Sequence, residues 1–183
     1  MHIDASYSMK DDRKQIYTDR FMESYDKYSD DIFRFCMTKT SDRDTSLDLT
    51  QETFTKFWSY ITKGNEIKNE RPLIYRIANN LIVDHYRKKK DILVENLSMA
   101  PEYQEHLKDD SQRKLEDNFD AEQALLLLKQ LPESTREIVN LRFVHDFSVT
   151  EIANVLNKDP KTVSVYLHRG LKKLRKILEQ YEK

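Results

Sequence analysis

The stretch Ser148–Arg169, SVTEIANVLNKDPKTVSVYLHR, decides how the sequence is interpreted. Ser148 and Glu151 have the spacing of a capping box, in which the Ser oxygen accepts from one backbone N–H and the Glu side chain accepts from another. The short helix that they open is expected to end at about Leu156. After a three-residue turn, Asp159-Pro160 supplies the N-cap and the first-turn proline of a longer basic helix. This order predicts a helix-turn-helix.

The longer helix has a buried face and an outer face. Its apolar residues predict a buried stripe of Val163, Leu167, Leu171, Leu174 and Leu178. At 100° per residue, the outer face of the first turns then presents polar, basic and small apolar groups suited to base edges and phosphates. The candidate DNA contacts are Lys161, Thr162, Ser164, Val165, His168, Arg169 and Lys172. Lys172, Lys173, Arg175 and Lys176 suit phosphates. A solvated amphipathic helix is the competing interpretation.

The rest of this second domain is predicted from residue 121 onward. A short helix is expected over Ala124–Leu131, and Pro132 then stands where the next helix begins. Ile138, Leu141 and Val144 are the expected inner residues of that helix. The domain is therefore expected to cover residues 121–183.

Three further helices are predicted in the N-terminal half. The first follows a polar, disordered tail at 1–18 and has the stripe Phe21, Tyr25, Tyr28, Ile32 and Phe35. The second is expected over Leu47–Ile61, with Leu47, Phe54, Phe57, Trp58 and Ile61 as its apolar residues. The segment 62–71 is expected to be a loop, and Pro72 suits the first turn of the third helix. Its inner stripe is Ile74, Ile77, Ala78, Leu81 and His85, so a first domain is predicted over 19–90.

The charge is unevenly distributed, although the formal net charge is only −1. Four Lys/Arg residues face one Asp within 84–90, and 158–183 holds eight Lys/Arg against three acidic residues. Between these basic patches, 91–120 has nine acidic and three basic residues, so it is interpreted as an acidic, flexible linker. With two Gly in 183 residues and 34% charged residues, the chain favours helices. The fold prediction is all-α: two small helical domains joined by a flexible linker, the second containing the helix-turn-helix.

The third helix carries the other basic patch, within the sequence YRIANNLIVDHYRKKK. Aromatic, amide and basic groups on one helix can hold single-stranded bases by stacking and hydrogen bonding while cations hold the backbone. Packing or solvated polar residues would give the same composition, so this observation alone leaves both interpretations open.

Together these segments resemble the extracytoplasmic-function (ECF) group of bacterial sigma factors, over about residues 20–90 and 121–180. Asp48-Leu-Thr-Gln-Glu-Thr-Phe54 with Trp58 is similar to the segment that binds the clamp of RNA polymerase, and Leu73–Leu81, continuing to Arg87, resembles the helix that recognises and melts the −10 element. Leu131-Pro132 and the helix-turn-helix resemble the reader of the −35 element. The loop 62–71 lacks the aromatic residue that many members carry, and Ser164-Val-Tyr166 departs from the pattern of the recognition helix.

The resemblance implies roles for particular residues. The expected polymerase contacts are Asp48, Gln51, Glu52, Phe54 and Trp58, of which at least one aromatic is expected to be core. The expected −10 contacts are Tyr75, Arg76, Asn79, Asn80, Asp84, Arg87 and Lys88. Asn80 and the 62–71 loop are the candidates for capturing an unstacked base. Core RNA polymerase, promoter DNA and an anti-sigma protein are the expected partners.

Other functions are less well supported by the sequence. A helix-turn-helix regulator without polymerase would leave the 48–58 segment without a role, and a helical adaptor is a further alternative. An enzyme is not expected, because the chain has no Gly-rich phosphate loop, no HExxH and no serine elbow. Neither a cofactor nor a metal is expected, since the five His residues are scattered and Cys36 is the only cysteine. A cytoplasmic protein without membrane insertion is predicted, because no apolar run is long enough to span a bilayer.

Overall fold

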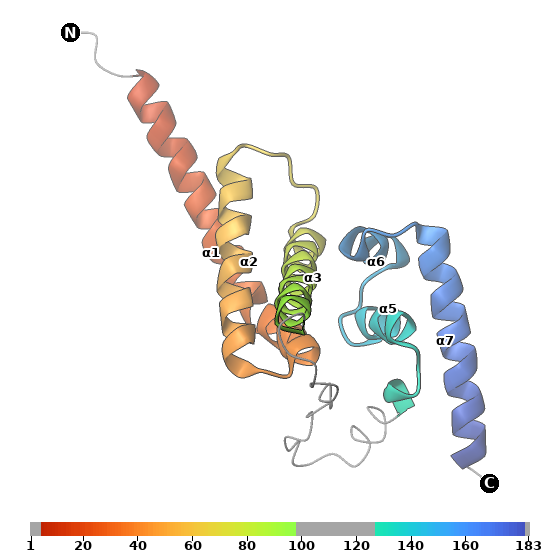
Figure 1. The fold of residues 1–183 in the computed structure, drawn as a ribbon. Coiled ribbons are helices and arrows are strands. Elements are labelled where there is room, and N and C mark those ends of the chain that lie inside the picture. The colour runs from red at the N-terminus through yellow and green to blue at the C-terminus, as the bar shows by residue number, and fades with distance from the viewer. Residues whose placement is uncertain (1–4, 98–126, 182–183) are drawn as a thin grey trace. The chain divides into compact units, whose positions relative to one another are not determined.

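The computed structural model describes residues 5–97 and 127–181, with side chains described for 14–89 and 127–179. Within these ranges the regular structure is helical, and the chain divides into two compact units. Unit 1 holds α1–α3 and unit 2 holds α5–α7 (Figure 1). The predicted all-α fold with two helical domains is confirmed. Most of the predicted linker, residues 98–120, lies outside the described residues.

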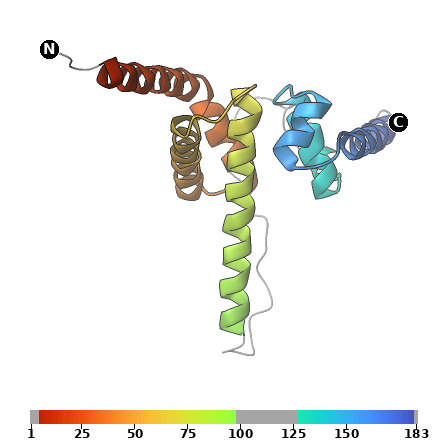
Figure 2. The same ribbon diagram turned by 90° about the horizontal axis from the view of Figure 1, so that it is seen from above.

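The first helix is longer than predicted. Helix α1 spans Ala5–Thr40, so the assignment of 1–18 to a disordered tail is wrong for residues 5–18. Helix extension adds one hydrogen bond for each residue that it orders, so a stable helix extends easily into neighbouring helix-forming residues. The amide of Gln15 also donates to Asp19 one turn later, at 2.7 Å. The N-terminal part of α1 projects beyond α2 in both ribbon views (Figures 1 and 2).

Helix α2 spans Arg43–Thr62 and begins before the predicted Leu47. Asp42 is its N-cap, because an Asp42 carboxylate oxygen accepts from the backbone N–H of Thr45 at 2.7 Å. Leu47 is exposed, whereas Leu49 takes a buried position on the inner face of the helix. The helix ends at the expected loop, where Gly64 adopts a positive φ of 73°.

Helix α3 spans Glu70–Leu97, so it passes the predicted end near Lys90 and takes in the first residues of the predicted linker. Pro72 lies in its first turn, as expected. The core of unit 1 forms where α1, α2 and the first half of α3 pack together, around Ile32, Phe35, Phe57, Ile61, Ile74, Tyr75 and Ala78. The second half of α3 extends away from the other two helices (Figure 2).

Unit 2 confirms the local signals of the sequence. Pro132 precedes α5 (Glu133–Phe143), and the Ser148–Glu151 capping box opens α6 (Val149–Leu156). Asn157 closes α6 in the left-handed conformation, with a φ of 50°. Helix α7 (Pro160–Tyr181) follows, and the backbone N–H of Lys161 donates to an Asp159 carboxylate oxygen at 2.8 Å. Of the predicted helix 124–131, residues 127–129 are helical and 124–126 lie outside the described residues.

The buried face of α7 differs from the predicted stripe. Val163 is buried and Leu167 and Leu174 are half-buried, but Leu171 and Leu178 are exposed. Gly170 and Ile177 occupy the inner positions instead. A Cβ atom at Gly170 would lie 2.7 Å from Cγ2 of Thr135 on α5, so glycine is what lets the two helices approach this closely. Val144, expected inside α5, is its C-cap and is exposed.

Candidate nucleic-acid interface

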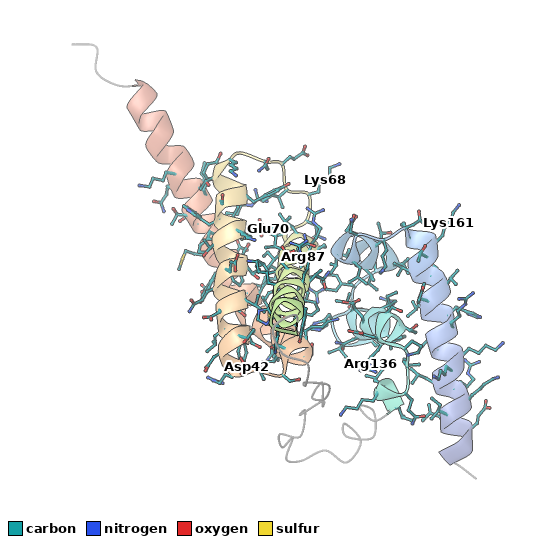
Figure 3. The ribbon with its side chains drawn as sticks, in the orientation of Figure 1. Asp42, Lys68, Glu70, Arg87, Arg136 and Lys161 are labelled. Carbon is teal, nitrogen blue, oxygen red and sulfur yellow. The ribbon has the colours of Figure 1, made fainter. Side chains whose placement is uncertain are left out.

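The outer face of α7 is built by the turn that precedes it. Asn157 and Asp159 fix the direction in which α7 leaves α6, and Val163 anchors its first turn in the core of unit 2. The predicted contacts on this face are all exposed: Lys161, Thr162, Ser164, Val165, His168, Arg169 and Lys172. Val165 is 45% exposed, which leaves an apolar group available at this surface. Figure 3 shows Lys161 pointing away from unit 2 at the start of α7.

The C-terminal half of α7 continues this surface with basic residues. Lys172, Arg175 and Lys176 are exposed. Lys173 is also exposed, but its Nζ donates to the backbone carbonyl of Gln130 at 2.6 Å. Its charge therefore lies directly after the short helical segment 127–129. No local sequence pattern indicates this contact, since it joins residues that are 43 positions apart in the chain.

The second surface lies on α3 and belongs to unit 1. Arg76, Asn80 and Arg87 are exposed and recur at helical spacing, so they share one face of the helix. Lys88 is also exposed, while Asn79 and Asp84 are half-buried. Arg87 donates to the Asp84 carboxylate at 3.1 Å, an exposed ion pair that bound phosphate can compete for. His85, expected inside, is half-buried and its ring lies 5.6 Å from that of Tyr86.

Tyr75 is not part of this surface. Its side chain is fully buried, with its ring centroid 5.2 Å from that of Phe35 on α1. Burial also raises the pKa of its hydroxyl to about 12. The predicted role of Tyr75 as a base contact is therefore wrong, because Tyr75 lies on the face of α3 that packs against the other helices of unit 1.

Two residues of α3 were missed by the sequence analysis. Val83 is 57% exposed and lies between Asn80 and Arg87 on the same helix face. Tyr86 is 42% exposed, and its hydroxyl donates to the backbone carbonyl of Lys39 at 2.5 Å. Val83 could have been predicted from the sequence, because its spacing from Asn80 and Arg87 places it on their face of the helix. Tyr86 supplies the exposed aromatic ring that had been expected at Tyr75.

A third surface lies on α2. Asp48, Gln51 and Glu52 are exposed within about one turn, and Glu52 also pairs with Lys56 at 3.3 Å. Phe54 is 2% exposed and packs edge-on against Tyr25, with ring centroids 4.8 Å apart.

Phe54 is therefore a core residue, and its assignment as a direct contact is wrong. Phe57 is also fully buried, which confirms that at least one aromatic of this helix is core. Trp58 is half-buried, with its ring centroid 5.3 Å from that of Phe21, so part of the residue remains exposed.

Among the described residues, no group of three His, Cys, Asp or Glu side chains is arranged to hold a metal ion. None of the helices described is both long enough and apolar enough to cross a bilayer.

Comparison with known proteins gives two family matches. The model of sigma-70 region 2 matches residues 24–92, and that of sigma-70 region 4 matches residues 121–174. The chain is 29% identical to the ECF RNA polymerase sigma factor SigW of Bacillus subtilis over 170 residues, which cover 87% of this chain and 89% of SigW. It is 24% identical to SigM of the same organism, an ECF RNA polymerase sigma factor, over 165 residues that cover 85% of this chain and 93% of SigM.

Two solved structures share the fold. One is the sigma factor RpoE in complex with the anti-sigma factor NepR from Bartonella quintana, with a TM-score of 0.66 and 19% identity over 87% of this chain and 97% of that one. The other is CnrH in complex with the cytosolic domain of CnrY, with a TM-score of 0.60 and 19% identity over 92% of this chain and 95% of that one.

Proposed function

We infer that this chain, which belongs to the sigma-70 family as an ECF sigma factor, binds core RNA polymerase and directs promoter-specific transcription initiation. The observation that carries this function is the presence of regions 2 and 4 in one chain, in that order. The chemistry of transcription belongs to the polymerase, so this chain supplies specificity and strand opening and is not itself an enzyme. We expect it in the cytoplasm, where polymerase acts.

The outer face of α7 is the proposed reader of the −35 duplex. Arg169 is placed to bind a guanine edge, and Val165 can contact a thymine methyl in the major groove. Lys172 lies one turn from His168 and is assigned to phosphate, which adds affinity without sequence information. The exposure of these side chains, together with the capped turn before them, supports the assignment.

Helix α3 is the proposed reader of the −10 element. Arg76, Asn80 and Arg87 form its polar face, and Val83 adds apolar contact in the middle. We add Tyr86 to this surface, since an exposed aromatic ring can stack a base and such stacking contributes about 1–3 kcal/mol per base. Asn79, Asp84 and Lys88 complete the set, and the loop after α2 remains the candidate for base capture.

The outer face of α2 is the proposed polymerase contact. Asp48, Gln51 and Glu52 offer acceptors to a basic partner, and the exposed part of Trp58 adds apolar area on the same helix. An anti-sigma protein is a further proposed partner, because RpoE and CnrH, whose folds resemble this one, are each seen in complex with another protein, NepR in the case of RpoE being an anti-sigma factor.

Transcription from a randomised promoter library tests the function. Purified core RNA polymerase with this chain should yield transcripts enriched in −35 and −10 motifs that are absent without it. Arg169→Ala should weaken specific binding by about 1–3 kcal/mol and relax the preference at one −35 position. Lys172→Ala should weaken binding to all sequences about equally, with a shallower salt dependence. If no transcript depends on the chain and polymerase binding is also undetectable, a DNA-binding regulator or a helical adaptor is left as the function.

A further inference from the structure

The loop between α2 and α3 is held by α1. Its first residues are tied to α2, because the backbone N–H of Gly64 donates to the Ile61 carbonyl at 2.9 Å and the Asn65 amide donates to the Tyr60 carbonyl at 3.0 Å. Its far end is tied to α1 by a side-chain cluster of Arg20, Ser24 and Glu70. The loop is therefore fixed at both ends by contacts within unit 1.

Arg20 makes two contacts in this cluster. Its Nε donates to one carboxylate oxygen of Glu70, the first residue of α3, and a terminal nitrogen donates to the Ile67 carbonyl at 3.4 Å. The other carboxylate oxygen of Glu70 accepts from the Ser24 hydroxyl at 2.5 Å, and Ser24 is almost fully buried. Both oxygens of Glu70 are thus satisfied by α1.

The cluster leaves the exposed side of the loop free for other contacts. Figure 3 shows Glu70 pointing back into unit 1, whereas Lys68 points away from it. Asn65, Glu66 and Lys68 are exposed, and the loop has no aromatic residue on which a base could stack. The polar contacts that the loop itself can offer a captured base are therefore hydrogen bonds, which depend on donor and acceptor positions far more strictly than stacking does.

We propose that Arg20, acting through Glu70 and the Ile67 carbonyl, is a positioning residue that holds the 63–69 loop ready to discriminate a base of the −10 element. A loop that is already ordered loses less conformational entropy when it binds a base, so its hydrogen-bonding groups are held in place before the base arrives. Arg20 lies before residue 24, where the region 2 match begins, so this contact comes from the part of α1 outside that match. The inference rests on the proposed function.

Arg20→Ala is the variant that tests the proposal. Arg34→Ala is its matched control, because Arg34 lies on the same helix and forms an exposed ion pair with Asp31, three residues away, at 2.7 Å. Arg20→Lys keeps the charge but cannot hold Glu70 and the Ile67 carbonyl with a planar fork, so an intermediate effect is expected. Arg20→Lys also replaces Arg20→Ala as the test variant if the Ala variant folds poorly.

Two readouts separate the loop from the function. Hydrogen exchange of the full chain without DNA should show the 63–69 amides exchanging about tenfold faster in Arg20→Ala than in the wild type, with α2 unchanged. In the promoter library, the ratio between the best and worst base at one −10 position should fall about three- to tenfold, while polymerase affinity and the −35 preference stay as in the wild type.

The outcomes are distinct. Unchanged exchange in the loop, or unchanged −10 preferences despite faster exchange, overturns the positioning role of Arg20. An equal loss at −35 and −10 positions also overturns it, since that pattern indicates general destabilisation. If the wild type gives no chain-dependent transcripts while the exchange result holds, the contact with α1 stands and the proposed function fails, together with the role in base discrimination.

Discussion

Gly170 lies where α7 comes closest to α5, and replacing it with Ala is expected to destabilise unit 2. An added Cβ would stand 2.7 Å from Cγ2 of Thr135 and 3.0 Å from Cγ2 of Val139. Carbon atoms prefer separations of about 3.5–4.0 Å, so the helices or these side chains must move apart. Both neighbours are β-branched and buried, which limits how far their methyl groups can rotate away.

Two effects of opposite sign set the magnitude. Ala is favoured over Gly inside a helix by about 1 kcal/mol. Inserting a methyl group into a packed core costs about 1–3 kcal/mol, and this site, with two contacts at 3.0 Å or less, belongs toward the upper end. The net loss in the free energy of unfolding of unit 2 is therefore expected to be about 2 kcal/mol.

Native-state hydrogen exchange of the full chain measures this loss in unit 2 alone. The most protected amides of α5 and α7 should exchange about thirtyfold faster in Gly170→Ala, while those of α1–α3 serve as the internal control. Thr135→Ser removes the nearer methyl group, so the double variant should recover part of the loss. Slower exchange in Gly170→Ala would refute the reasoning, because helix propensity would then outweigh a contact that is not as close as described.

Three further predictions concern other parts of the chain. Ser148→Ala should cost unit 2 about 1 kcal/mol by removing the α6 capping box, and Thr150→Ala, an exposed neighbour, should not; urea unfolding compares them. Hydrogen bonds from the Thr45 hydroxyl and N–H lower the pKa of Asp42 below its ordinary 3.8. The stabilisation by Asp42 is therefore present above that value and lost as the pH falls through the lowered pKa, so the deficit of Asp42→Ala at pH 7 should shrink as the pH falls below 3.8 in acid-unfolding curves. Burial raises the pKa of the Cys36 thiol to about 11, so a thiol reagent at pH 8 should modify Cys36 slowly in the folded chain and quickly in urea; fast modification without urea would contradict its burial.

The features that the sequence predicted well are local ones. The capping box at Ser148, the turn at Asn157 and the cap at Asp159 each involve hydrogen bonds between residues no more than five apart, so their residue types are sufficient evidence. The exposure of the predicted DNA contacts on α7 could be predicted in the same way. Once the first residue of the helix is known, the helical repeat determines which residues of its first turns point outward.

The errors arise where distant segments decide the result. The stripe on α7 was assigned to leucines, but Thr135 and Val139 of α5 leave room at position 170 only for glycine, and the buried face turns accordingly. Phe54 was assigned to a partner surface, but Phe21 and Tyr25 of α1 cover its ring. The contacts of Arg20 with Glu70 and Ile67 join residues about 50 positions apart, and no spacing pattern in the sequence predicts them.

Tyr75 and Tyr86 show why periodicity alone cannot separate a core aromatic from a binding one. They are 11 residues apart on α3, which is close to three full turns, so both side chains lie on nearly the same face of the helix. Tyr75 is nonetheless fully buried and Tyr86 is 42% exposed. The two residues differ because α1 and α2 pack against this face only along the first half of α3. The second half of α3 extends beyond them (Figure 2). The hydroxyl of Tyr86 meets the end of α1 at the Lys39 carbonyl, so this residue marks the edge of the core. An aromatic residue that is anchored at its hydroxyl and partly exposed suits base stacking. The lengths of the neighbouring helices, rather than the pattern of α3 itself, determine which tyrosine is in that position.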